Sequence, residues 1–100
     1  MRIRIVPQPL EMEFIVPSKT VIVGSSVGLH ARPAATISEA VTKSGVAVTI
    51  ALEGGEPVDA GSALMIMTLG AGFGTQVTVD SEDEDVLNTI AGLVEKDLDS

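Results

Sequence analysis

The chain has 100 residues, with six Lys or Arg against fourteen Asp or Glu, so its formal net charge is −8 at neutral pH. This acidic balance, in a chain without Trp or Tyr, argues against a nucleic-acid-binding surface, which needs basic stripes and stacking rings. Cysteine is absent and histidine occurs once, which excludes disulfides and thiolate metal sites and leaves only carboxylates for a metal cage.

The length corresponds to one domain with a modest core. No apolar run approaches the roughly 20 residues that a membrane span needs, and Pro7 interrupts the first residues too soon for a signal peptide. We therefore expect a cytoplasmic protein with no membrane insertion and no bound metal or cofactor.

The first part of the chain differs in character from the rest because it carries Pro7, Pro9 and Pro17. Residues 2–6 have the composition of an added edge strand, although the stretch can equally be unstructured. We expect residues 1–18 to be an N-terminal extension, to which we assign no role, and residues 19–100 to form the domain.

The single histidine lies between a predicted strand and a predicted helix. Residues 20–23 are mostly β-branched and predict the strand, whereas the apolar side chains of residues 34, 37 and 41 recur at helical spacing and predict a helix over 32–44. His30 therefore falls at or just before the first helical turn, where backbone N–H groups have no partner within the helix.

This position suits phosphate chemistry. The positive end of a helix disfavours a cationic imidazole, which leaves the ring nucleophilic, and it favours a phosphoryl anion. Arg32 adds a permanent cation with forked donors, and Pro33 fits the first turn because its missing N–H would have no partner there. The pattern predicts that His30 handles phosphate, against the alternative of an ordinary surface or core histidine.

The remaining elements follow in order. Gly45 is expected to end the helix in the left-handed region, and residues 46–52 form a strand that buries residues 46, 48, 50 and 52. A turn over 53–56 leads to a short edge strand over 57–60, a helix over 63–69, a glycine-rich connection and a strand over 75–79. In the last helix we expect Ser81 as the cap, Glu84 reaching back to it, and a buried stripe of Val86, Leu87, Ile90, Leu93, Val94 and Leu98.

The order β-α-β-β-α-β-α predicts an α+β fold with two layers, a four-stranded antiparallel sheet covered by helices on one face. The periodicity leaves the strand order open.

The short helix over 63–69 begins with the five apolar residues 63–67, more than one buried stripe can use. We expect Leu64 and Met67 to be exposed contacts on a docking surface, and Ile66 and Leu69 to lie in the core; a plain core helix is the alternative. Ser62 is the expected N-cap.

Residues 24–28 match the G-x-S-x-G pattern of serine hydrolases and follow a strand, as that motif requires. A hydrolase sheet does not fit in this length, and the histidine comes only four residues after Ser26. We interpret the serines as loop residues and keep a Ser26 hydrolase as a distant alternative.

The segment Gly28–Ala34, with His30, Arg32 and Pro33, resembles the active-site motif of the HPr family of the bacterial phosphoenolpyruvate:sugar phosphotransferase system. Residues 61–70 resemble the family's helix with a regulatory serine and an apolar docking surface, and the resemblance covers about residues 19–98. It implies an open-faced β-sandwich with strand order 1-4-2-3.

The resemblance also implies a function. His30 would accept a phosphoryl group on Nδ1 from enzyme I, which phosphoenolpyruvate charges, and pass it to IIA components of sugar permeases. Arg32 would be the charge partner of the phosphate, with the N–H groups of Ala31 and Arg32 helping to hold it. Such a protein is a stoichiometric carrier and not an enzyme, and we expect a monomer. The docking surface would comprise residues Leu29, Ala31, Arg32, Ala63, Leu64 and Met67.

By the same resemblance Ser62 is a candidate regulatory phosphorylation site, although Gly61 stands where many relatives have a basic residue. The chain also has Val27 where relatives carry a small polar residue, and Glu39, Thr42 and Met65 where they carry lysines. The alternative function is a regulatory binding module whose His30 or Ser62 phosphorylation state is read by partner proteins. The sugars served, and the choice between a carbon and a nitrogen branch, are not encoded in any motif.

Overall fold

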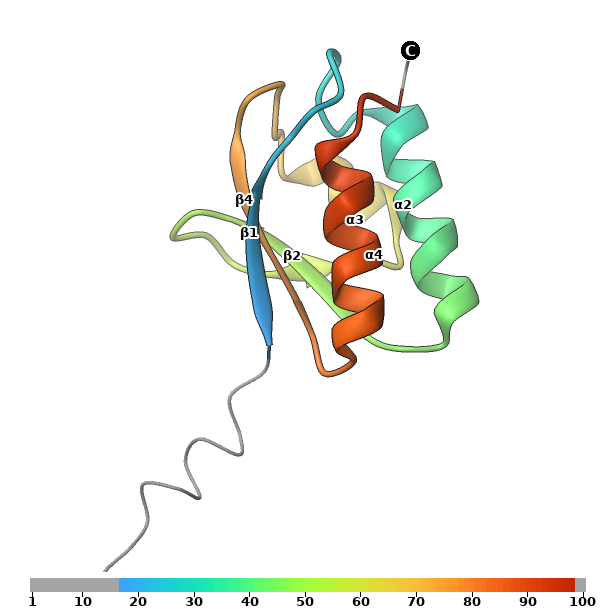
Figure 1. Cartoon of the computed structure of the whole chain (residues 1–100). Helices are drawn as coiled ribbons and strands as arrows, with labels where there is room; N and C mark the ends of the chain where they lie inside the picture. Colours follow the sequence, from blue (N-terminus) through green and yellow to red (C-terminus); the bar gives the residue numbers. More distant parts are fainter. Residues whose placement is uncertain (1–16, 99–100) are drawn as a thin grey trace, which may run out of the picture.

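The computed structural model describes residues 17–98. Three helices and four strands alternate along this part of the chain (Figure 1). They are β1 (Ser18–Ile22), α2 (Ala31–Ser44), β2 (Val48–Leu52), β3 (Val58–Asp59), α3 (Ala63–Thr68), β4 (Gln76–Ser81) and α4 (Glu84–Glu95). The predicted order β-α-β-β-α-β-α is confirmed.

The four strands form one antiparallel sheet in the order β1-β4-β2-β3. β4, which is formed from the C-terminal half of the chain, lies between β1 and β2 and pairs Val77 with Val21 and Val79 with Ile50. The strand order implied by the resemblance is therefore confirmed.

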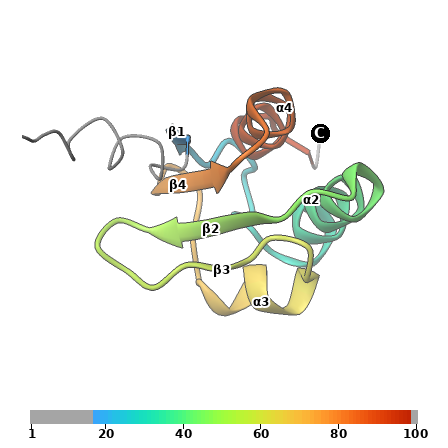
Figure 2. The same ribbon diagram turned by 90° about the horizontal axis from the view of Figure 1, so that it is seen from below.

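The sheet and the helices form two layers. In Figure 2, α2 and α4 lie on one side of the sheet, α3 lies beyond the β3 edge, and the loop between β2 and β3 projects away from α2 and α4. Side chains alternate along each strand, so that one face of the sheet buries valines and isoleucines while the other carries mainly Thr, Gln and Asp.

The core is aliphatic and contains no aromatic side chain among its buried members. α2 contributes residues 34, 37 and 41, at the spacing read from the sequence. Of the four residues expected to be buried around β2, Val48 and Ile50 are buried, whereas Val46 and Leu52 are half-buried at its ends. The buried members are Val21, Val23, Leu29, Ala34, Ile37, Val41, Val48, Ile50, Ala60, Ile66, Ala71, Val77, Val79, Leu87, Ile90, Ala91 and Val94.

The expected cap of the last helix is wrong. Asp83, not Ser81, is the N-cap of α4, and its carboxylate accepts hydrogen bonds from the N–H groups of Asp85 and Val86 at 2.9 and 3.1 Å. Ser81 is still part of β4, because it pairs with Val48. The helix starts only after the sheet pairing ends, which moves the cap by two residues.

The stripe expected on this last helix is confirmed at Leu87, Ile90 and Val94. Val86, Leu93 and Leu98 are only half-buried and pack against the edge of the core. Ala91 completes the buried face.

The proposed edge strand over residues 2–6 lies outside the described residues. At the start of the described chain the carbonyl of Pro17 accepts a hydrogen bond from the N–H of Ser81 at 3.1 Å. Within residues 17–98 no helix has the length and apolar character to cross a membrane. The same part of the chain brings together no group of three side chains able to hold a metal ion.

Candidate functional site

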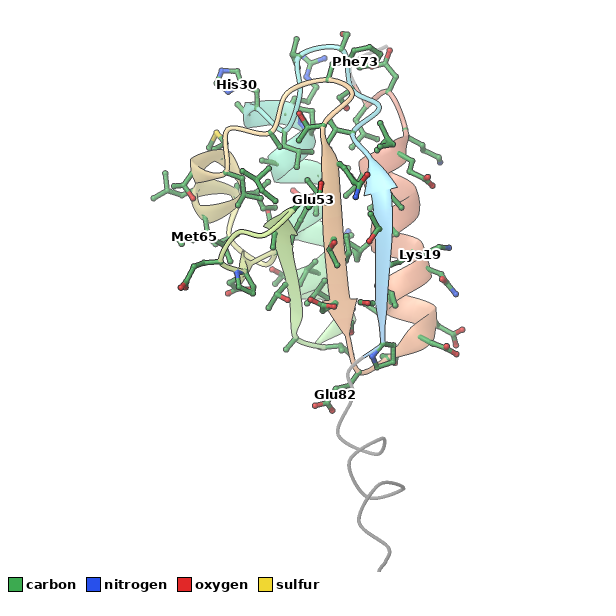
Figure 3. All side chains as sticks on the ribbon, turned by 90° about the vertical axis from the view of Figure 1, so that its left-hand side faces the viewer. Lys19, His30, Glu53, Met65, Phe73 and Glu82 are labelled. Atoms are coloured by element: carbon green, nitrogen blue, oxygen red, sulfur yellow. The ribbon has the colours of Figure 1, made fainter. Side chains whose placement is uncertain are left out.

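His30 is the N-cap residue of α2. Its backbone is extended, its carbonyl accepts the N–H of Ala34 at 2.9 Å, and its ring makes no capping hydrogen bond. The side chain is exposed and projects from one end of the molecule (Figure 3). The predicted placement at the helix start is therefore confirmed, and the ring is accessible to another protein.

The first turn of α2 carries the other residues of the motif. Ala31 and Arg32 are exposed, and Pro33 is buried in the third helical position. Because proline has no N–H, Ala31 and Arg32 supply the backbone donors of this turn. The helix then buries Ala34 and runs to Ser44, where Gly45 adopts φ 70° as the sequence predicts.

The loop before His30 is held against the glycine-rich loop that precedes β4. The N–H of Leu29 donates to the carbonyl of Ala71 at 2.8 Å. Gly28 has φ +76°, and a Cβ atom there would lie 2.5 Å from the Ala71 oxygen. Only glycine allows this close approach, so the crossing of the two loops fixes where His30 emerges.

The same loop is also attached to the end of α4. Ser25 is buried; its hydroxyl donates to the carbonyl of Lys96 at 3.2 Å and accepts from the N–H of Leu98 at 3.1 Å. Sequence reasoning read the serines at 25 and 26 together as loop residues and missed this structural role. Ser26, the position of the hydrolase alternative, is exposed.

A shallow cavity of about 180 Å³ adjoins the imidazole. Its walls come from three segments that are distant in the sequence: the loop before α2, the end of α3 and the glycine-rich loop. The glycines were interpreted only as a flexible connection, so their place beside His30 was missed. The lining residues are Val27, Leu29, His30, Met67, Gly70, Ala71 and Gly72.

α3 presents an apolar surface on the same side as the cavity. Leu64 is 69% exposed and Met65 is also exposed, whereas Ile66 is completely buried. These placements of Leu64 and Ile66 agree with the expectation; Met67 and Leu69 are half-buried and pack against the core, as does Ala63. Met67 therefore presents less surface than we expected, although it lines the cavity.

The structure corrects the placement of Leu29. It was expected to contact partners, but only 4% of its surface is exposed and it belongs to the core. Leu29 immediately precedes the N-cap, and Ala34 is the fourth helical residue; apolar residues at these two positions commonly pack together and fix the direction of the entering chain. This helix-entry pattern is visible in the sequence and would have predicted the burial.

Ser62 is the N-cap of α3, as predicted, and its hydroxyl accepts the N–H of Met65 at 3.2 Å. It is half-buried at the border of the apolar surface.

The two segments that line the cavity beside His30 carry almost no charge, whereas Glu95, Lys96 and Asp97 follow at the end of α4, which the loop before His30 contacts through Ser25. Residues 20–38 contain Arg32 as their one Lys, Arg, Asp or Glu, and residues 60–79 contain none. Because the whole chain has a net charge of −8, its acidic groups are concentrated elsewhere. The cavity beside His30 is therefore lined by neutral and apolar side chains, with Arg32 two residues further along the chain.

Comparison with known proteins agrees with this arrangement. Residues 17–96 match the family model described as the PTS HPr component phosphorylation site. The phosphocarrier protein HPr of Streptomyces coelicolor is 42% identical over 84 residues, which cover 81% of this chain and 90% of that protein.

Solved structures with the same fold include two HPr proteins. HPr from Bacillus anthracis has 32% identity and a TM-score of 0.73, covering 79% of this chain and 96% of its own. HPr-C-His from Thermoanaerobacter tengcongensis has 26% identity and a TM-score of 0.75, covering 84% and 97%. The sequence match over residues 17–96, together with this fold, shows that the chain belongs to the HPr family of phosphocarrier proteins.

Proposed function

We propose that this phosphocarrier acts in the cytoplasm, accepting a phosphoryl group on His30 from enzyme I, charged by phosphoenolpyruvate, and passing it to IIA components of sugar permeases. The observation that carries the proposal is the exposed imidazole of His30 at the N-terminus of α2, beside Arg32 and above a cavity. Membership of the HPr family supports the choice of partners.

The transfer needs little from this chain beyond position and charge. Nδ1 of His30, the nitrogen that the family resemblance suggests, attacks phosphorus with its lone pair; the bond from phosphorus to the donor breaks, and its electron pair stays with the donor. The N–H groups of Ala31 and Arg32 and the positive end of α2 would stabilise the phosphoryl oxygens, with the Arg32 guanidinium neutralising their charge. Attack by an acceptor nucleophile on the same phosphorus then returns the lone pair to His30.

Transient docking suits a carrier that must leave one partner before it meets the next. α3 reaches the cavity beside His30 through Met67 and exposes Leu64 and Met65, and we propose that a partner that reaches the ring also covers this helix. The protein supplies the phosphoryl acceptor, and we propose that each partner supplies the remaining catalytic groups.

Intact-mass measurement after incubation with phosphoenolpyruvate, magnesium and the cognate enzyme I tests the proposal. We expect one acid-labile phosphoryl group on the wild type and on a Ser26→Ala variant, and none on His30→Ala. A wild-type protein that gains no phosphoryl group, or a His30→Ala variant that still gains one, would overturn the proposal. Transfer to IIA is then followed as loss of that mass on adding the acceptor.

We also propose that phosphorylation of Ser62 would weaken docking. Ser62 immediately precedes Ala63 and Leu64, so a phosphate there would place negative charge at the border of the docking surface. A Ser62→Asp variant should bind enzyme I more weakly than Ser62→Ala, which lacks the same cap hydroxyl without adding charge. Equal affinity of the two variants for enzyme I would show that negative charge at position 62 does not regulate docking.

A further inference from the structure

Phe73 is a large aromatic side chain that the core does not use. It is 68% exposed, although the chain has only two phenylalanines and no Trp or Tyr. The surrounding residues 70–74 form the glycine-rich loop, which lines the cavity beside His30 through Gly70, Ala71 and Gly72. Neither the fold nor the phosphoryl chemistry described above accounts for an aromatic ring at this position.

Backbone hydrogen bonds hold the loop at both ends. The N–H of Gly74 donates to the carbonyl of Val23 at 2.9 Å, and the N–H of Thr75 donates to the carbonyl of Gly72 at 3.1 Å. On the other side the carbonyl of Ala71 accepts the N–H of Leu29. Phe73 is therefore presented from a backbone that is connected directly to the loop carrying His30.

Phe73 and His30 lie at the same end of the molecule (Figure 3). Through the Leu29–Ala71 hydrogen bond, covalent geometry limits the separation of their Cα atoms to about 18 Å. A typical protein interface covers about 800 Å² of each partner, a disc of roughly 16 Å radius. This radius is close to the upper bound on the His30–Phe73 separation, so an interface centred near His30 can extend to the region of Phe73.

Val27 and Phe73 are exposed on the two loops that meet near His30, and Leu64 and Met65 are exposed on α3. Arg32 is the one Lys, Arg, Asp or Glu in the two segments that carry them, residues 20–38 and 60–79. A partner that covers these two segments is matched by a neutral, apolar surface around an anionic phosphoryl group. Aromatic side chains contribute strongly at such interfaces because they bury a large area at a small entropic cost.

We propose that Phe73, with Val27 beside the cavity, extends the docking surface and inserts into an apolar depression on the proteins that exchange phosphoryl groups with His30. This inference rests on the proposed function. The protein that covers Phe73 and Val27 is the phosphoryl-exchanging partner and not a second copy of this chain. These residues belong to the two loops that meet beside His30, and any phosphoryl donor to His30 must cover that surface.

The test compares phosphorylation of the wild type, Phe73→Gln and Phe73→Leu by the cognate enzyme I over a range of carrier concentrations. Val46→Ser is the matched control, because Val46 lies beyond the far end of the 14-residue helix α2, about 21 Å along its axis from His30. Thermal unfolding confirms that each variant is folded, and sedimentation measures the oligomeric state of each chain alone.

We expect Phe73→Gln to raise KM about tenfold, the effect of losing an aromatic contact, with the maximal rate unchanged. Phe73→Leu should recover part of the loss, and Val46→Ser should behave as the wild type. Unchanged KM in Phe73→Gln, with the wild type phosphorylated on His30, would overturn this inference and leave the proposed function intact. A Phe73-dependent dimer without a KM effect would assign the ring to self-association and overturn it as well. A wild type that enzyme I fails to phosphorylate overturns the proposed function and this inference together.

Discussion

His30 has a fixed backbone and an exposed side chain. Its backbone is fixed as the N-cap of a 14-residue helix, and its ring is exposed without a capping hydrogen bond. In the proposed function the fixed backbone would direct the helix N-terminus towards the phosphoryl group, while the exposed ring would be available for attack. The chemistry therefore depends on neighbouring residues mainly for position and charge.

Arg32 should affect the rate of transfer more than stability. Replacing it by Gln removes the guanidinium that faces the phosphoryl charge, and we expect phosphorylation at saturating enzyme I to slow about tenfold or more. Arg32→Lys keeps the positive charge without the forked donors, and its rate should lie between the rates of the wild type and of Arg32→Gln. Rapid-quench measurement of phosphohistidine formation gives the rates; equal rates for wild type and Arg32→Gln would show that the cation has no part in transfer.

Gly28 should be intolerant of any side chain. Gly28→Ala combines the strain of φ +76° with a contact of 2.5 Å to the Ala71 oxygen, so we expect a loss of about 2 kcal/mol or more in unfolding free energy. Gly72→Ala is the matched control, since nothing lies within 4 Å of the added Cβ. Urea denaturation measures both; similar stabilities for the two variants would contradict this account of the loop crossing.

At the scale of elements, helix boundaries depend on where sheet pairing stops. β4 continues to Ser81 because that residue pairs with Val48, and α4 can start only after it, with Asp83 as the cap. α3 has six residues, too short to be stable alone, and depends on burying Ile66 against the core and on the Ser62 cap. The remaining apolar part of this short helix belongs to the proposed docking surface.

The α4 cap supplies a prediction of stability. Asp83→Ala removes the acceptor for two backbone N–H groups, and we expect a loss of about 1 kcal/mol in unfolding free energy. Asp83→Asn keeps an acceptor oxygen, so its unfolding free energy should fall by only a few tenths of the loss expected for Asp83→Ala. Thermal or urea unfolding distinguishes them, and an Asp83→Ala variant as stable as the wild type would show that the cap contributes nothing.

Over the whole molecule, charge and docking are separated. Acidic residues surround the start of α4, at positions 80 and 82–85, whereas the two segments around His30 carry Arg32 alone. If this surface docks partners as proposed, apolar contact has to supply most of the affinity there.

This separation predicts weak dependence of docking on salt. We expect the Kd for enzyme I to change less than about threefold when ionic strength is raised well above the physiological value, because screening acts on one exposed cation. Met65→Lys, which adds a second cation to the surface, should increase the salt dependence. Strong weakening of wild-type binding by salt, measured by titration calorimetry, would contradict the prediction.

Local patterns in the chain were sufficient to determine the order of the elements, the residues that α2 buries, Gly45 as the end of that helix and His30 at its start. These properties depend on neighbours within a few residues, where periodicity and capping chemistry act. Contacts between distant segments required the tertiary structure: the pairing that moves the α4 cap to Asp83, and the loop crossing that places glycines 70 and 72 beside His30. The length of a strand pairing and the close approach of two loops are set by packing across the fold, and no local pattern specifies them.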